Sequence, residues 1–313
     1  MSSFLRGRMA FYGKYQPPHH AAAVSVYKPH HTKPLLIDSP HSGRNYPADF
    51  VPRCNFAALV DAEDNWVDEL ARYAPTVGAT LIAAEFPRTY IDVNRCVNDI
   101  DLQMLDGAAK EKLAPTAILS EKGKAGAGLI RRWLTPGVDL YPHKLSETDI
   151  SHRINYYYLP YHQALQYHVE QLYSQFGQLW HINIHSMPRP SGSKDWPDMV
   201  LGDRDGSSSA GHYTQAMADI LRGLGYKVAI NYPYKGVEIL RRYGRPLANI
   251  HSIQLEIGKH LYWDRDAMKK TSGFSTLQEN ITELLTQMAG WQGVQLPLPA
   301  PKYQPLPRLL AAE

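Results

Sequence analysis

Segments of strand length and segments with helical periodicity alternate along this chain, and this alternation constrains its fold more than any other feature. The expected strands are 34–38, 79–84, 180–185, 227–230 and 252–257, and the expected helices are 57–73, 147–175, 210–223 and 273–288. Parallel strands need a crossover connection, which is usually a helix. The alternation therefore predicts an α/β fold in which helices flank a mixed, mostly parallel sheet.

The two ends of the chain differ from its centre. Residues 1–33 are polar, are interrupted by proline, and contain the pairs His19-His20 and His30-His31; residues 291–313 are rich in proline. We therefore expect a single domain over 34–290, between an irregular N-terminal extension and a proline-rich tail. Three glycines within 99–150 lack the ending of a phosphate-binding loop, so we expect a mobile surface loop there.

Composition excludes several classes of protein. Apolar residues make up 44% and charged residues 20% of the chain, which is ordinary for a globular protein. No apolar run approaches the roughly 18 residues of a membrane-spanning helix, and no signal-peptide core follows the N-terminus. The 33 basic and 30 acidic residues nearly balance, which argues against a nucleic-acid partner. We expect a cytoplasmic protein, and composition indicates no oligomeric state.

Two histidines and a pair of acids stand close to the ends of expected strands. His41 follows the first strand, His185 ends the third, and Glu63-Asp64 lies between them on an expected helix. Histidine is the commonest metal ligand, and two histidines with one carboxylate form a known set for catalytic zinc. The pattern makes a metal site a candidate, although any one such histidine is more often a hydrogen-bonded structural residue than a ligand.

The segment after the second strand is rich in charge. Arg88, Asn94 and Arg95 surround apolar residues that we expect to be half-buried. A buried arginine needs an anionic partner, either a protein carboxylate such as Asp92 or Asp101, or a carboxylate of the substrate. The sequence leaves both interpretations open.

Glu256 is an acid between apolar neighbours on the last expected strand. Burial would favour its neutral form and suit it to acid–base chemistry, whereas an ion pair with Lys259 would make it structural. Ser42 and Ser186 each neighbour a histidine, but adjacent residues on a strand point to opposite faces, and neither serine lies in a nucleophile elbow. Metal-assisted hydrolysis therefore fits better than a serine nucleophile.

Several short motifs follow one another in order from about residue 35 to 265. They are the segments 39–44, 63–64, 67–70, 86–88, 91–95, 128–130, 160–162, 185–188, 201–206, 233–236 and 254–257, with Tyr141 and Asn231. Taken together, they resemble the N-formylglutamate amidohydrolases, zinc-dependent enzymes related in fold to the zinc carboxypeptidases and aspartoacylases. Each motif alone is unspecific, and the ordered set carries the resemblance.

The resemblance implies one zinc ion per chain. Its ligands would be His41, His185 and a carboxylate of the 63–64 pair, for which we favour Asp64 over Glu63. Glu256 would be the base that activates the water and passes its proton to the departing amine.

The resemblance also assigns the residues that follow the second strand. Arg88 would stabilise the oxyanion, and Asn94 with Arg95 would hold the α-carboxylate of the substrate. The chain departs from the expected pattern at Asn183, where we would expect an aspartate that orients a zinc ligand. Weaker metal binding would follow from this change.

The resemblance predicts hydrolysis of N-formyl-L-glutamate to L-glutamate and formate, a step of histidine degradation. Lys235, Arg204 and Arg241 are candidates for binding the γ-carboxylate. Two alternatives stay open. One is hydrolysis of another small N-acyl amino acid, because a fold does not fix its substrate. The other is a non-catalytic protein that binds acidic amino acids.

Overall fold

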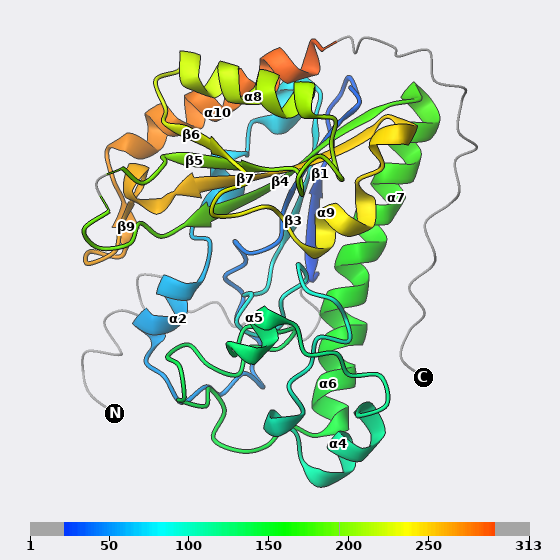
Figure 1. Cartoon of the computed structure of the whole chain (residues 1–313), viewed down its shortest axis with the longest axis vertical. Helices are drawn as coiled ribbons and strands as arrows, with labels where there is room; N and C mark the ends of the chain where they lie inside the picture. Colours follow the sequence, from blue (N-terminus) through cyan, green and yellow to red (C-terminus); the bar gives the residue numbers. More distant parts are fainter. Residues whose placement is uncertain (1–21, 194, 292–313) are drawn as a thin grey trace.

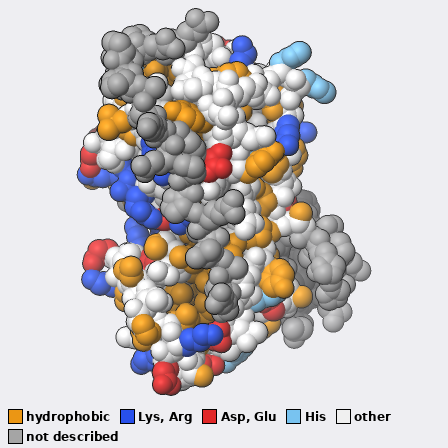
Figure 2. All heavy atoms as spheres, turned by 90° about the vertical axis from the view of Figure 1, so that its right-hand side faces the viewer, with side chains coloured by type: hydrophobic (Ala, Val, Ile, Leu, Met, Phe, Trp, Pro, Cys, Tyr) orange, Lys and Arg blue, Asp and Glu red, His pale blue; other side chains and the backbone are white. Residues whose placement is uncertain are grey.

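The computed structural model describes residues 22–193 and 195–291. The pair His19-His20 and residues 292–313 of the expected tail lie outside the described residues. No described helix is both long enough and apolar enough to cross a membrane. On the face that carries the longest helix, basic, acidic and hydrophobic side chains are interspersed (Figure 2), in keeping with the near-balance of charge in the composition.

A seven-stranded sheet forms the centre of the molecule, in the order β1-β3-β2-β4-β7-β5-β6 (Figure 1). Its strands are β1 (Val24–Tyr27), β2 (Leu35–Ser39), β3 (Thr80–Ala84), β4 (Leu179–Met187), β5 (Met199–Gly202), β6 (Val228–Ile230) and β7 (Ile250–Gly258). The pairs β2–β3, β2–β4, β4–β7 and β5–β6 are parallel, whereas β1–β3 and β5–β7 are antiparallel. The predicted α/β fold with a mixed, mostly parallel sheet is confirmed.

Helices cover both faces of this sheet. The α-helices are α2 (Phe56–Ala62), α3 (Val67–Leu70), α4 (Gly107–Leu113), α5 (Glu121–Lys124), α6 (Glu147–Arg153), α7 (Leu159–Phe176), α8 (Gly211–Gly223), α9 (Glu238–Tyr243) and α10 (Gly273–Ala289). The shorter elements are η1 (Ala74–Val77), η2 (Leu102–Met104), the π-helical turn η3 (Ile154–Tyr158), η4 (Pro246–Ala248), η5 (Lys259–Leu261) and the hairpin β8 (Trp263–Asp264) with β9 (Lys269–Lys270).

The core lies in two layers, because successive residues of a strand point to opposite faces. Leu36 packs with α7 and α9 on one face, whereas Leu35 and Ile37 pack with α8 and α10 on the other. Figure 1 shows α8 and α10 above the sheet and α7 at its side. In place of the single helix expected over 147–175, α6, η3 and α7 follow one another directly. The π-helical turn η3 interrupts the α-helix just before Pro160.

Three expectations about local structure were wrong. Residues 24–27, which we placed in an irregular extension, form β1 because they pair with β3. β5 (Met199–Gly202) was not among the expected strands. The segment 99–150 is not a surface loop: it buries Leu129 and Ile130, and a Cβ at position 128 would lie 2.5 Å from the carbonyl oxygen of Asp99. Glycine at 128 therefore permits a close approach of two backbones.

Candidate metal centre and active site

The carboxyl ends of three neighbouring strands bring the candidate residues together. His41 stands two residues beyond the end of β2, and His185 lies near the end of β4. Glu256 of β7 is directly opposite His185 in the parallel register. Because partners in register point to the same face, His185 and Glu256 are neighbours on the sheet. Active sites of α/β proteins are commonly found at this edge.

Asp64 reaches the same place because a helix ends just before it. We expected Asp61 to Asp68 within one helix, but α2 ends at Ala62 and Glu63 is extended, with φ −88° and ψ 160°. The Asp64 backbone N–H donates to the His41 carbonyl oxygen at 3.1 Å, and the Asn65 side chain donates to a carbonyl at the end of α2. These contacts replace helical hydrogen bonds and attach the acid to the loop after β2.

His41, Asp64 and His185 form a buried cluster whose candidate ligand atoms all lie within 4.8 Å of one another. Asp64 Oδ2 is 3.3 Å from His41 Nδ1 and 3.0 Å from His185 Nδ1. Beyond the 3.3 Å contact, His41 Nδ1 makes no hydrogen bond among the described residues, although it is fully buried. A buried nitrogen without a hydrogen bond is costly, and a cation between these atoms would satisfy it. Two imidazoles and a carboxylate suit zinc.

The protonation states of the cluster also suit a metal, which requires neutral imidazole and ionised carboxylate. Burial lowers the pKa of His185, which keeps the ring neutral. Burial alone would raise the pKa of Asp64, but the hydrogen bond with His185, the adjacent His41 ring and the charge of Arg88 hold it well below its usual range.

The outer nitrogens of both histidines have partners that turn Nδ1 towards Asp64. His41 Nε2 lies 2.7 Å from Asp92 Oδ1, and His185 Nε2 lies 2.7 Å from Asn183 Oδ1. Metal-binding histidines commonly donate their other N–H to such an acceptor. We had considered Asp92 only as an ion-pair partner and missed its contact with His41. The tendency of metal-binding histidines to donate their second N–H to a carboxylate was the signal that could have pointed to Asp92.

The structure gives a physical account of asparagine at position 183. Asn183 Nδ2 lies 3.0 Å from each carboxylate oxygen of Asp38, its register partner on β2. Both residues are fully buried. Asp38 also accepts hydrogen bonds from His181 and Tyr161. Asp38, which lies behind Asn183, thus supplies the negative charge that we expected at position 183. An aspartate at 183 would place a second carboxylate against that of Asp38.

Glu63 points away from the histidines. Its carboxylate accepts hydrogen bonds from the Thr89 hydroxyl at 2.6 Å and from the Arg88 backbone N–H at 3.0 Å. Burial raises its pKa to about 7, against the opposing effects of Thr89 and Arg88. Of the two acids that we had considered, the structure therefore brings Asp64 to the histidines.

Arg88 lies beside the cluster and is held by carboxylates. Its Nη2 donates to Asp92 at 2.9 Å, and its Nη1 is 3.6 Å from Asp64. An internal ion pair with Asp92 was one of the two interpretations left open, and the structure contains it. Asp101, the other acid considered, pairs with Arg132 instead.

Glu256 is buried and has no cationic partner within ion-pair distance among the described residues. Burial first, and then the charge of Asp64, raise its pKa well above the ordinary value. Its Oε1 accepts a hydrogen bond from Gln254 at 2.8 Å. Lys259, the partner considered from the sequence, donates instead to the carbonyl oxygens of Asp61 and Glu63.

Asn94 and Arg95 already have partners within the protein. Asn94 Nδ2 lies 3.1 Å from His185 Nε2 and 3.4 Å from Asn183 Oδ1, and Asn94 Oδ1 accepts from the Ile239 N–H. The Asn94 Oδ1 is therefore already occupied by a backbone N–H. Arg95 Nε donates to the Ala127 carbonyl at 2.9 Å, and the side chain remains partly exposed.

The three candidates for γ-carboxylate binding contact other groups. Lys235 pairs with Asp205, Arg241 pairs with Glu238, and Arg204 donates to a backbone carbonyl. Across residues 22–193 and 195–291, no contact connects any of them to the histidine cluster.

The model of the N-formylglutamate amidohydrolase family matches residues 33–263 of this sequence. The chain belongs to this family. It is 28% identical over 260 residues to an N-formylglutamate deformylase of Pseudomonas putida, which covers 80% of this chain and 87% of that protein. An N-formylglutamate deformylase of Pseudomonas aeruginosa is 26% identical over 266 residues, covering 82% and 93%.

Solved structures agree with this membership. The crystal structure of an N-formylglutamate amidohydrolase from Ralstonia eutropha superposes with a TM-score of 0.81 at 40% identity, covering 86% of this chain and 98% of that one. A protein of Agrobacterium tumefaciens, at 17% identity and a TM-score of 0.58, shares the fold. The predicted family is thereby confirmed, and the relation to zinc carboxypeptidases stays a prediction.

Proposed function

We propose that this enzyme hydrolyses the amide of N-formyl-L-glutamate, giving formate and L-glutamate. The observation that carries the proposal is the buried cluster of His41, Asp64 and His185, with Glu256 beside it, in a member of this family. The Pseudomonas relatives are named for this reaction. We further propose that the three clustered residues hold one zinc ion. When bound, zinc supplies a Lewis acid that polarises a carbonyl group and lowers the pKa of water.

Glu256 is the proposed general base. It takes a proton from the attacking water as the new carbon–oxygen bond forms at the formyl carbon, and it delivers that proton to the amine nitrogen as the carbon–nitrogen bond breaks. Because Oε1 accepts from Gln254, Oε2 is the oxygen left to carry the proton. A raised pKa brings the carboxylate closer to the operating pH, which favours proton transfer in both directions.

Arg88 and Arg95 are proposed to meet the negative charges of the substrate. Asp92 holds the Arg88 guanidinium in place beside the cluster, where it can stabilise charge that develops on the formyl oxygen. Arg95, with Asn94 next to it, is placed at the α-carboxylate. The ion pair with Asp92 does not exclude Arg88 from this role, since it fixes the guanidinium before the substrate arrives.

The test combines metal analysis with an assay of formate release, before and after treatment with a chelator. We expect about one zinc per chain, and turnover of N-formyl-L-glutamate that chelation abolishes and added zinc restores. Metal without turnover would favour another N-acyl amino acid as substrate. Absence of both metal and turnover would favour a binding protein for acidic amino acids. Cytoplasmic location and a step in histidine degradation stay predictions.

A further inference from the structure

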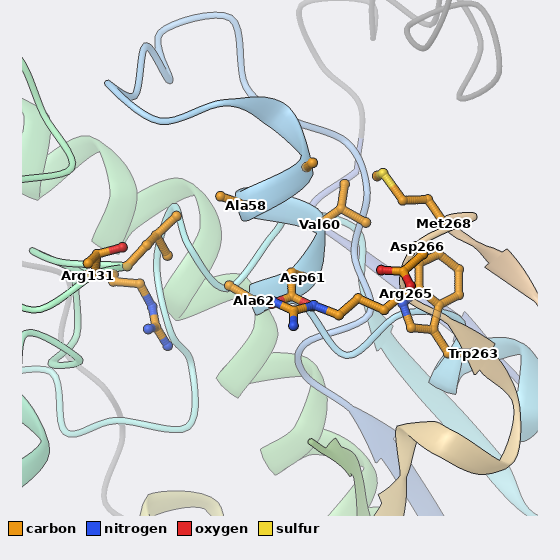
Figure 3. Close-up of a pocket in the computed structure, with 12 residues that line it drawn as sticks. Ala58, Val60, Asp61, Ala62, Arg131, Trp263, Arg265, Asp266 and Met268 are labelled. Carbon is orange, nitrogen blue, oxygen red and sulfur yellow. The ribbon is translucent and has the colours of Figure 1, made fainter. Parts of the chain in front are cut away.

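A cavity of about 670 Å³ is lined by two arginines, and one of them has no acidic partner within ion-pair distance among the described residues. α2, the segment 131–135 and the β8–β9 hairpin line it (Figure 3). Ala62, one of its lining residues, directly precedes Glu63 and Asp64. The wall of the cavity therefore includes a residue that lies two positions before the candidate ligand Asp64.

Two arginines line this cavity, and they differ in their partners. Arg265 forms an ion pair with Asp61, with Nε 2.7 Å from Oδ1 and Nη2 2.8 Å from Oδ2. Arg131 makes no side-chain hydrogen bond and no ion pair with any residue of the described chain. Figure 3 shows Arg131 across the cavity from Asp61 and Arg265, which leaves its guanidinium free to meet a ligand.

The backbone fixes Arg131 next to the residues that surround the active site. Leu129 and Ile130, which precede it, are fully buried, and the Leu129 carbonyl accepts from the Asp92 N–H at 2.8 Å. Residue 131 also forms a β-bridge with Ala127, whose carbonyl oxygen accepts from Arg95 Nε. Arg131 and Arg95 therefore lie on two neighbouring backbone segments.

The electrostatic surroundings of Arg131 favour the binding of an anion. Burial, and then the charge of Arg88, lower the pKa of Arg131 to about 10, and Asp92 and Glu63 only partly oppose this. The guanidinium is still charged at neutral pH. A desolvated cation without a carboxylate partner is costly to a protein unless a ligand supplies the counter-charge.

We propose that Arg131 binds the side-chain carboxylate of the substrate and so sets the preference of the enzyme for N-formyl dicarboxylic amino acids. This inference rests on the proposed function and adds the residue that recognises the second negative charge. Arg95 is already placed at the α-carboxylate, so the two neighbouring arginines match the two carboxylates of one molecule. A guanidinium is well suited to this, because its planar fork can donate two parallel hydrogen bonds to a carboxylate.

The test compares N-formyl-L-glutamate with N-formyl-L-glutamine, which has nearly the same shape but lacks the second charge. In the wild-type enzyme, we expect kcat/KM to be about 10- to 100-fold higher for the glutamate substrate. Arg131→Gln should lose most of that ratio, mainly through a higher KM for the glutamate substrate, with little change for the glutamine substrate. Arg131→Lys, which keeps the charge but not the fork, should fall between the two.

Arg265→Gln is the matched control, because Arg265 lines the same cavity but is neutralised by Asp61; it should keep the wild-type ratio. An equal loss for both substrates in Arg131→Gln would overturn the inference and leave the proposed function intact. If Arg131→Gln does not fold, Arg131→Lys takes its place. The inference would then be overturned if Arg131→Lys kept the wild-type ratio of kcat/KM between the two substrates, or if the wild type itself showed equal kcat/KM for both. No formate release from either substrate by the zinc-loaded wild type would refute the proposed function and the inference with it.

Discussion

The amide of Asn183 separates a buried negative charge from a candidate metal ligand, so Asn183→Asp should destabilise the protein strongly. In the wild type, Nδ2 lies 3.0 Å from both oxygens of Asp38, and Oδ1 lies 2.7 Å from His185 Nε2. Burial would raise the pKa of Asp38, but hydrogen bonds from His181, Tyr161 and Asn183 hold it below its ordinary value. The carboxylate is therefore ionised, and the substitution brings a second carboxylate against it.

The size of the effect follows from two limits. Two unit charges about 4 Å apart repel each other by about 4 kcal/mol at an effective dielectric constant of about 20. Protonating one carboxyl instead costs about 1.4 kcal/mol per pKa unit, or about 4 kcal/mol over the roughly three units between an ordinary aspartate and pH 7. Both routes lower the free energy of unfolding by about 4 kcal/mol at pH 7.

The loss should shrink at lower pH. The substitution raises the pKa of a native-state carboxyl above its unfolded value, so the penalty is small near that unfolded value and grows as pH rises. At pH 5, where only about one unit separates the pH from the ordinary pKa, the loss should be about 1.5 kcal/mol. Urea unfolding of both proteins at pH 5 and pH 7, with a chelator present to remove metal, measures this difference.

The exchanged variant Asp38→Asn/Asn183→Asp is the control, since it again places one amide opposite one acid. We expect it to recover at least half of the stability lost in Asn183→Asp, which a double-mutant cycle with Asp38→Asn would quantify. Wild-type stability of Asn183→Asp at pH 7, or an equal loss at the two pH values, would refute the placement of a charged Asp38 behind this asparagine.

Four further predictions test the residues of the site. Glu256→Gln should retain metal and lose about 10²- to 10⁴-fold in kcat, and a wild-type kcat would remove Glu256 as the base. Because burial raises the Glu256 pKa, wild-type turnover should also fall towards acid pH as the base becomes protonated, with a midpoint above that of an ordinary glutamate in the pH profile of kcat. His41→Ala and His185→Ala should each lower metal content measured by mass spectrometry, and full occupancy in both would refute the site. Arg95→Ala should raise KM by about 10- to 100-fold with little effect on kcat, whereas an unchanged KM would exclude it from the pocket.

The sheet was largely predictable because its central strands are buried on both faces. Residues 35–37 and 81–84 are continuous apolar runs, which is the pattern of a strand covered by helices on both sides. β1 is different: its residues Val24–Tyr27 are only half-buried or exposed, and they form a strand through pairing with β3 at the edge of the sheet. A short edge strand of this kind carries little local signal.

The site was predictable in its residue types but not in its connections. The sequence places histidines and acids near strand ends, yet the end of α2 before Glu63 depends on a hydrogen bond between residues 23 positions apart, Asp64 and His41. The same holds for Asp92 with His41, separated by 51 positions. Hydrophobic periodicity indicates only the local preference of a segment for helix or strand. These contacts, in contrast, form between segments that only the folded sheet brings together. The resemblance to the family therefore supplied the roles of the residues, and the structure supplied their partners.

The contrast among the buried acids narrows their possible roles. Hydrogen bonds and neighbouring cations, working against burial, hold the pKa values of Asp64 and Asp92 well below the usual range, so these two are fixed as charges. Burial raises the pKa of Glu63 to about 7 and raises the pKa of Glu256 well above its ordinary value, so these two acids hold a proton more readily than Asp64 and Asp92 do. Acid–base roles commonly fall to the group whose pKa is displaced upwards beside one that stays ionised. Both Glu63 oxygens are occupied by Thr89 and the Arg88 backbone, whereas Glu256 faces His185 across the register, so Glu256 is the acid that can both hold a proton and reach the reacting atoms.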